Sequence, residues 1–133
     1  MYLNMLNRRE KHLFLALEIY ISEIDGDFSD EEKQIINAHC LEMGIDNNNF
    51  ELRMEVEEIL KEIEGNLDDT KKHIFFLELA GTVLADNIYY EKERQIMERL
   101  ANILKIKQGE IDEAFSIIKD LKSVYLRCAK YVS

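Results

Sequence analysis

The residues of this chain best suited to chemistry are four acids that occur as two matching pairs. Asp25 precedes Glu32 by seven residues, and Asp86 precedes Glu93 by the same distance, 61 positions further along the chain. Grouped carboxylates supply the hard oxygen ligands that favour Ca²⁺, Mg²⁺ or Mn²⁺ over zinc or copper. The spacing therefore predicts one divalent-cation site made of two half-sites, with Asp25, Glu32, Asp86 and Glu93 as its ligands.

These acids also have a structural interpretation. Ser29 and Glu32 form the sequence pattern of a capping box, in which both side chains satisfy free amides at a helix start. Glu93 lacks this partner, because Tyr90 takes the place of the serine. The two aspartates fall near the C-terminal ends of predicted helices, where the partial negative charge disfavours an acid unless something compensates it. Shared cation binding and simple capping with solvated acids therefore stay open as alternatives.

The sequence excludes several well-defined metal-binding and catalytic motifs. A standard EF-hand loop fails in both copies, because Ile21 takes the first ligand position of one and Leu84 the third position of the other. A di-iron carboxylate bundle needs a Glu three residues before a His, and His12, His39 and His73 all lack one. These histidines are interpreted as surface or helix-lining residues. With no nucleophile arrangement, phosphate loop or dinucleotide fingerprint, we expect neither an enzyme nor an organic cofactor.

The composition and charge of the chain limit the classes of protein to which it can belong. A chain of 133 residues, 47% of them hydrophobic, suits one compact domain. Its formal net charge of −10 argues against nucleic acid as a partner. No apolar run approaches the ~20 residues of a membrane span and no signal-peptide pattern is present, so we expect a cytoplasmic protein with a protein partner. Cys40 and Cys128 are interpreted as two buried thiols.

The elements that must position the acids are all predicted to be helices. The chain has no proline and only five glycines, so helices are rarely interrupted. Apolar residues at helical spacing predict a first helix that ends near residue 25. The same pattern predicts five further helices, over residues 29–43, about 50–64, 71–85, 91–104 and 108–131.

The order of these helices indicates a duplication. At the same offset of 61 residues Phe28 matches Tyr89 and Ile35 matches Ile96. We therefore predict an all-α fold in which two three-helix units, about residues 12–65 and 71–130, pack as one bundle-like domain over residues 1–133. Each unit alone is too small to bury its apolar faces.

The acidic turns also carry a family resemblance. The run Asp-Gly-Asp-Phe-Ser at 25–29 leading to Glu32, and the pair Ala-Asp at 85–86 leading to Glu93, resemble the tellurite-resistance TerB-like family. The resemblance covers most of residues 12–130. It implies an all-helical domain with an acidic metal-binding pocket, used as an interaction module in bacterial stress-response and membrane-linked complexes. It implies no reaction.

The second copy departs from the family pattern. Asn87 replaces a glycine but tolerates the same left-handed backbone, whereas Ile88 stands where the first copy has Asp27 and removes an oxygen ligand. Two main function classes remain. One is a cation-responsive TerB-like module that presents a surface to a partner protein. The other is a metal-free helical adaptor or dimerisation domain, and a hydrolase that uses the metal to activate water is a third alternative.

Overall fold

The computed structural model describes residues 1–24, 28–46 and 54–133, and every regular element among them is a helix. The elements in chain order are η1 (Leu3–Met5), α1 (Arg8–Glu23), α2 (Asp30–Met43), α3 (Val56–Asn66), α4 (Asp69–Val83), α5 (Glu91–Leu104) and α6 (Gln108–Val132). The prediction of an all-α fold is confirmed. None of the helices in this described part of the chain is long and apolar enough to cross a membrane.

The predicted helix boundaries agree closely with those observed. The start of α2 follows from Ser29, whose hydroxyl accepts the backbone N–H of Glu32 at 3.1 Å. Its end follows from Gly44, which adopts a left-handed φ of 71°. The third helix differs from the prediction at both ends. α3 begins at Val56 instead of near residue 50, with Met54 and Glu55 outside it, and it runs through Gly65 to Asn66 instead of stopping at the glycine.

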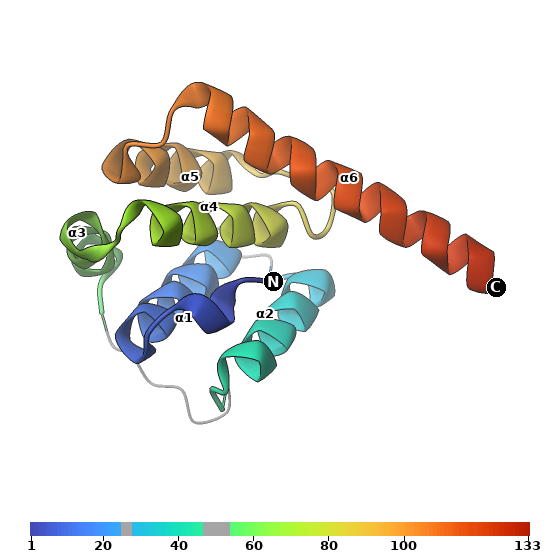
Figure 1. The fold of residues 1–133 in the computed structure, drawn as a ribbon, viewed down its shortest axis with the longest axis horizontal. Helices are drawn as coiled ribbons and strands as arrows, with labels where there is room; N and C mark the ends of the chain where they lie inside the picture. The colour runs from blue at the N-terminus through green and yellow to red at the C-terminus, as the bar shows by residue number, and fades with distance from the viewer. Residues whose placement is uncertain (25–27, 47–53) are drawn as a thin grey trace.

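Two helices form the centre of the bundle. α1 packs against α2, α3 and α4, while α4 packs against α2, α5 and α6, and α3 also contacts α5 (Figure 1). The aromatic rings of Phe14 in α1 and Phe75 in α4 are fully buried and meet edge to face, with centroids 5.4 Å apart. α4 contributes a buried apolar stripe that comprises Phe75, Phe76, Leu79, Val83 and Leu84.

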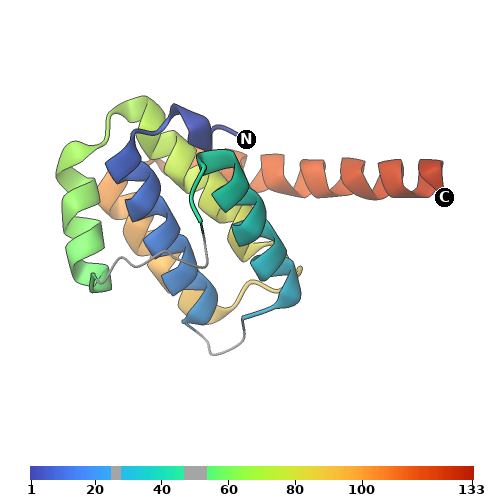
Figure 2. The ribbon, with the colours of Figure 1, turned by 90° about the horizontal axis from the view of Figure 1, so that it is seen from below.

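The last helix reaches beyond the bundle. The first half of α6 packs on α4, and its second half projects away from the other helices in both views (Figures 1 and 2). Residues 123–133 are all exposed, and we call this segment the overhang. It carries several large apolar side chains, including Tyr125 at 69% exposure and Tyr131 at 91%.

The prediction that both cysteines are buried is correct for one of them and wrong for the other. Cys40 in α2 is buried, as expected, but Cys128 in α6 is exposed. The prediction failed for Cys128 because helical periodicity marks a face as apolar without showing whether another helix covers it.

Candidate functional site

Glu32 and Glu93, two of the predicted cation ligands, are both buried at the starts of their helices. Each side chain is only 2% exposed. A carboxylate oxygen of Glu32 accepts the backbone N–H of Ser29 at 3.2 Å, and one of Glu93 accepts that of Tyr90 at 3.1 Å. Glu93 therefore caps α5 in the same way even though no serine precedes it, a role that the sequence had not indicated.

The second turn is shaped by Asp86 and Asn87. An Asp86 carboxylate oxygen accepts the backbone N–H of Ile88 at 3.1 Å, and Asn87 adopts a left-handed φ of 65°. Asparagine tolerates this conformation, so the turn forms without a glycine at position 87. In the first turn, Asp25 lies outside the described residues.

A positive charge from the chain itself lies at the second turn. The ammonium of Lys122 in α6 donates to the carbonyl of Leu84 and to the side-chain oxygen of Asn87, and lies 3.5 Å from the carbonyl of Ala85. Burial lowers the pKa of Lys122, and the nearby charge of Asp86 opposes that shift. The ammonium therefore compensates the negative helix end at which Asp86 stands.

The arrangement of the four predicted ligands is described only in part. The start of α2 and the link between α4 and α5 lie at the same end of the bundle (Figures 1 and 2). Among the described residues, no group of three or more His, Cys, Asp or Glu side chains is placed to hold a metal ion. Glu32, Asp86 and Glu93 thus do not form such a group without Asp25.

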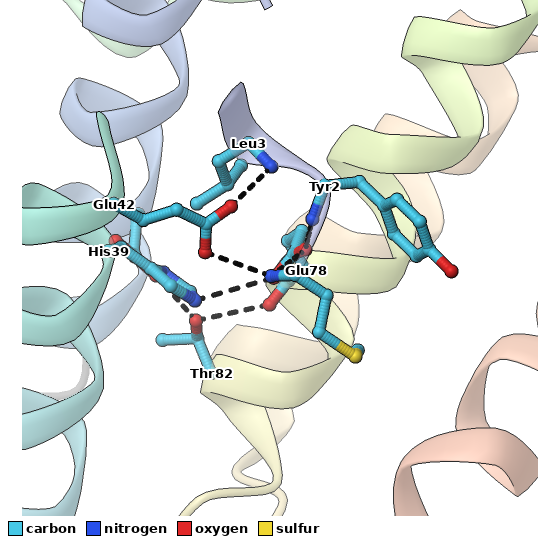
Figure 3. A network of polar contacts seen from close by, with 8 residues as sticks. Tyr2, Leu3, His39, Glu42, Glu78 and Thr82 are labelled. Atoms are coloured by element: carbon cyan, nitrogen blue, oxygen red, sulfur yellow. Dashed lines mark hydrogen bonds and ion pairs between the residues drawn. The ribbon is translucent and has the colours of Figure 1, made fainter. Parts of the chain in front are cut away.

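A second cluster of polar side chains connects the central helices. The Nδ1 atom of His39 in α2 lies 2.6 Å from a carboxylate oxygen of Glu18 in α1, and its Nε2 atom lies 3.4 Å from Glu78 in α4. Thr82, one turn further along α4, donates its hydroxyl to the same Glu18 oxygen at 2.6 Å. We call Glu18, His39, Glu78 and Thr82 the buried polar cluster; the last three are labelled in Figure 3.

The N-terminal segment joins this cluster. The amino group of Met1 lies 2.7 Å from Glu78 and 3.0 Å from Glu42. The backbone N–H of Tyr2 donates to Glu78 at 2.9 Å, and that of Leu3 donates to Glu42 at 2.7 Å (Figure 3). Residues far apart in the sequence therefore hold η1 against α2 and α4.

The protonation of His39 decides what the cluster does chemically. Burial acts to lower the pKa of His39, but the hydrogen bonds and negative charges of Glu18 and Glu78 outweigh it and raise the pKa to about 9. Burial likewise acts to raise the pKa of Glu78, but hydrogen bonds from His39, the Met1 amino group and Tyr2 lower it to about 2. At neutral pH both ring nitrogens of His39 therefore carry protons, which face Glu18 and Glu78. The cluster is a structural clamp.

Sequence reasoning missed this clamp, although a signal for it existed. Glu18 and Glu78 are single acids inside the apolar runs 13–21 and 74–84. A charge in such a run has to be buried, and a buried charge needs a partner. The partner itself could not be identified from spacing, because His39 lies on a different helix.

No protein-family model, no curated protein and no solved structure matches this chain. The resemblance to the TerB-like family therefore rests on the sequence motifs alone.

Proposed function

We propose that this chain is a non-enzymatic protein-interaction module whose binding surface is the overhang of α6. The observation that carries the proposal is an apolar stripe that begins in the bundle and continues beyond it. Ala114 and Ile118 are buried against the bundle, and Leu121 is half-buried. The next members of the stripe, Tyr125 and Val132, are 69% and 80% exposed.

The physical argument concerns exposed apolar area. Val124 and Tyr131 flank the stripe on one side and are themselves exposed, which widens the apolar face. Contiguous exposed apolar surface is uncommon on monomeric proteins and marks binding surfaces, and tyrosine is enriched among residues that dominate binding energy. The buried polar cluster is a poor candidate for a reactive centre, because His39 is held protonated between two glutamates.

The TerB-like interpretation, with a role in bacterial stress response, forms part of this proposal. Its support is the motif in the two turns and a correspondence between helix pairs. Within the first unit α1 packs against α2 and α3, and within the second unit α4 packs against α5 and α6 in the same way. Between the units, the contact of α2 with α4 is matched by the contact of α5 with α1. This pattern is expected of a duplicated three-helix unit.

Cation binding by the paired turns is the second candidate function, supported by the matching buried positions of Glu32 and Glu93. We expect Ca²⁺, Mg²⁺ or Mn²⁺ to raise the melting temperature of chelator-treated protein. An ion at ten times its Kd stabilises by about 1.4 kcal/mol, a rise of roughly 4–6 °C for a domain of this size.

The double variant Asp25→Asn with Asp86→Asn should lose this rise. Asp69→Asn is the matched control, because it removes one acid from the start of α4, away from both turns. If none of the three ions raises the melting temperature at millimolar concentration, the acids are caps and solvated charges only.

The proposed binding surface is tested by crosslinking in the native cell. A photoreactive phenylalanine analogue replaces Tyr125 in the overhang or, as the control, Glu64, which is exposed on α3. We expect crosslinked protein from the Tyr125 position and none from the Glu64 position. Equal crosslinking at both positions, or none at either, would contradict the proposal.

A further inference from the structure

We infer that the overhang of α6 pairs with the overhang of a second copy of this chain, antiparallel and about a twofold axis. The inference rests on the proposed function, since it names the partner of the same surface. Three observations carry it: the spacing of the stripe, the sizes of the side chains that a twofold axis brings together, and the distribution of charge.

The spacing of the stripe is that of a helix that packs against one other helix. Its members from Ile118 onward are separated alternately by three and four residues, namely Ile118, Leu121, Tyr125, Cys128 and Val132. This repeat of 3.5 residues keeps one seam facing a partner helix along its length. Within the chain the seam is covered at Ile118 and only partly at Leu121, and the exposed remainder is available to another helix.

An antiparallel twofold axis gives this stripe complementary layers. With the axis between positions 126 and 127, Tyr125 faces Cys128 of the second copy, and Leu121 faces Val132 of the second copy. Each layer then joins a larger side chain to a smaller one. Such alternation lets facing side chains interdigitate without leaving voids.

The charge distribution selects the antiparallel orientation. Residues 117–133 contain four basic and one acidic side chain, a net charge of +3, whereas residues 1–116 contain 13 basic and 26 acidic, a net charge of −13. Antiparallel overlap brings the basic C-terminal end of each overhang toward the acidic bundle of the other copy, because position 133 of one copy faces position 120 of the other. Parallel pairing would place the two basic ends together and far from both bundles.

The size of the contact sets its strength. The overhang has 11 residues, about 16 Å of helix, so the paired area lies at the low end of specific interfaces. We expect a dimer that is half dissociated at about 10–100 µM, as is typical of small interfaces. Such a dimer forms only at high local concentration.

Sedimentation velocity from about 1 to 200 µM tests the inference, and far-ultraviolet circular dichroism verifies that each variant is folded. Tyr125→Glu should weaken dimerisation at least about tenfold, because it places a charge in the central layer. Ser123→Glu is the matched control, since it adds the same charge only two residues away but on the opposite face of the helix. It should change the dissociation constant by less than about threefold.

The two cysteines provide an independent measure in unaltered protein. Cys128 is exposed in the single chain and should react with a maleimide more slowly as the dimer forms, while buried Cys40 stays slow at every concentration. The orientation is read from spin labels at position 133, in Ser133→Cys combined with Cys128→Ser. Antiparallel pairing predicts a separation of about 20 Å or more, and parallel pairing about 10 Å.

A chain that remains a monomer at 200 µM, or a Tyr125→Glu variant that dimerises as well as the Ser123→Glu control, would overturn the inference. Labels about 10 Å apart would overturn the antiparallel arrangement. If the purified chain is monomeric while Tyr125 crosslinks to a different protein in the cell, the proposed function stands and only the identity of its partner is wrong. If Tyr125 crosslinks to nothing in the cell, the proposed function itself fails.

Discussion

The free energy of unfolding is expected to fall by about 2 kcal/mol as the pH rises from 6.5 to 8.5, because the unfolded chain releases the His39 proton over this range while the folded chain keeps it between Glu18 and Glu78. In the folded chain the pKa of His39 is raised to about 9, against about 6.5 in an unfolded chain. Below pH 6.5 both states bind the proton, and the stabilisation is fully present. Between these two values only the folded state holds it, and the stabilisation disappears as the pH passes 9.

Chemical denaturation at pH 5.5, 6.5, 7.5 and 8.5 measures this dependence. The range stops at pH 8.5 because the pKa of buried Cys40 is raised to about 11, mainly by burial, and the unfolded thiol would add a similar loss of stability above that pH. The Met1 amino group also has a raised pKa, despite the opposing effect of its burial, through its bonds to Glu78 and Glu42. Its contribution has the same sign as that of His39.

The variant His39→Gln should remove most of this slope and leave the smaller part contributed by Met1. His73→Gln is the matched control, because His73 is an exposed histidine paired with Glu110 at 2.5 Å. Exposed pairs contribute little to stability, so the control should keep the slope of the unaltered chain. A His39→Gln chain with the full slope would show that the buried polar cluster does not hold a charged histidine.

Replacing Phe14 by alanine is expected to cost about 3–5 kcal/mol of stability, the range for removing a buried aromatic side chain. Phe14 is fully buried and packs edge to face against both Phe75 and His39, with ring centroids 5.4 and 5.7 Å away. Its removal takes away both aromatic contacts and leaves a cavity between α1, α2 and α4. The melting temperature should fall by roughly 10–20 °C.

Phe28→Ala is the control for this change, because Phe28 is half-buried at the edge of the bundle, where it packs near Lys33. It should cost about 1 kcal/mol or less. Combined with His39→Gln, Phe14→Ala should cost less than the sum of the two single changes, since the two rings are in contact. Additive losses would indicate that the cavity and the buried polar cluster are independent.

Most of the fold could be predicted from local patterns. Helix starts and ends were correct for α2 and α5 because Ser29, Gly44 and the apolar spacing act within a few residues of each other. The buried stripe of α4 also follows from local spacing, since Phe75 and Leu79 repeat at helical spacing. Gly65 misled the prediction because its contribution of about 1 kcal/mol is small enough for the surrounding helix to absorb.

The candidate sites could be predicted only in part. The acids of the two turns were found by spacing, and Glu32 and Glu93 lie in the first turns of the helices predicted for them. The ammonium of Lys122 reaches the second turn from a helix 35 or more residues away. His39 meets Glu18 and Glu78 across three helices. Neither approach leaves a periodic signal, because each depends on how whole helices pack.

The amino-acid sequence alone determined the helices, their apolar faces and the spacing of seven residues within each pair of acids, since each of these depends on residues no more than about two helical turns apart. The packing of the helices decided which polar groups meet in the interior and where the bundle ends. Tyr125 and Val132 belong to the same stripe as Ile118 by sequence, yet only Ile118 is buried. A helix encodes which of its faces is apolar, and only the arrangement of its neighbours determines how much of that face is left for a partner.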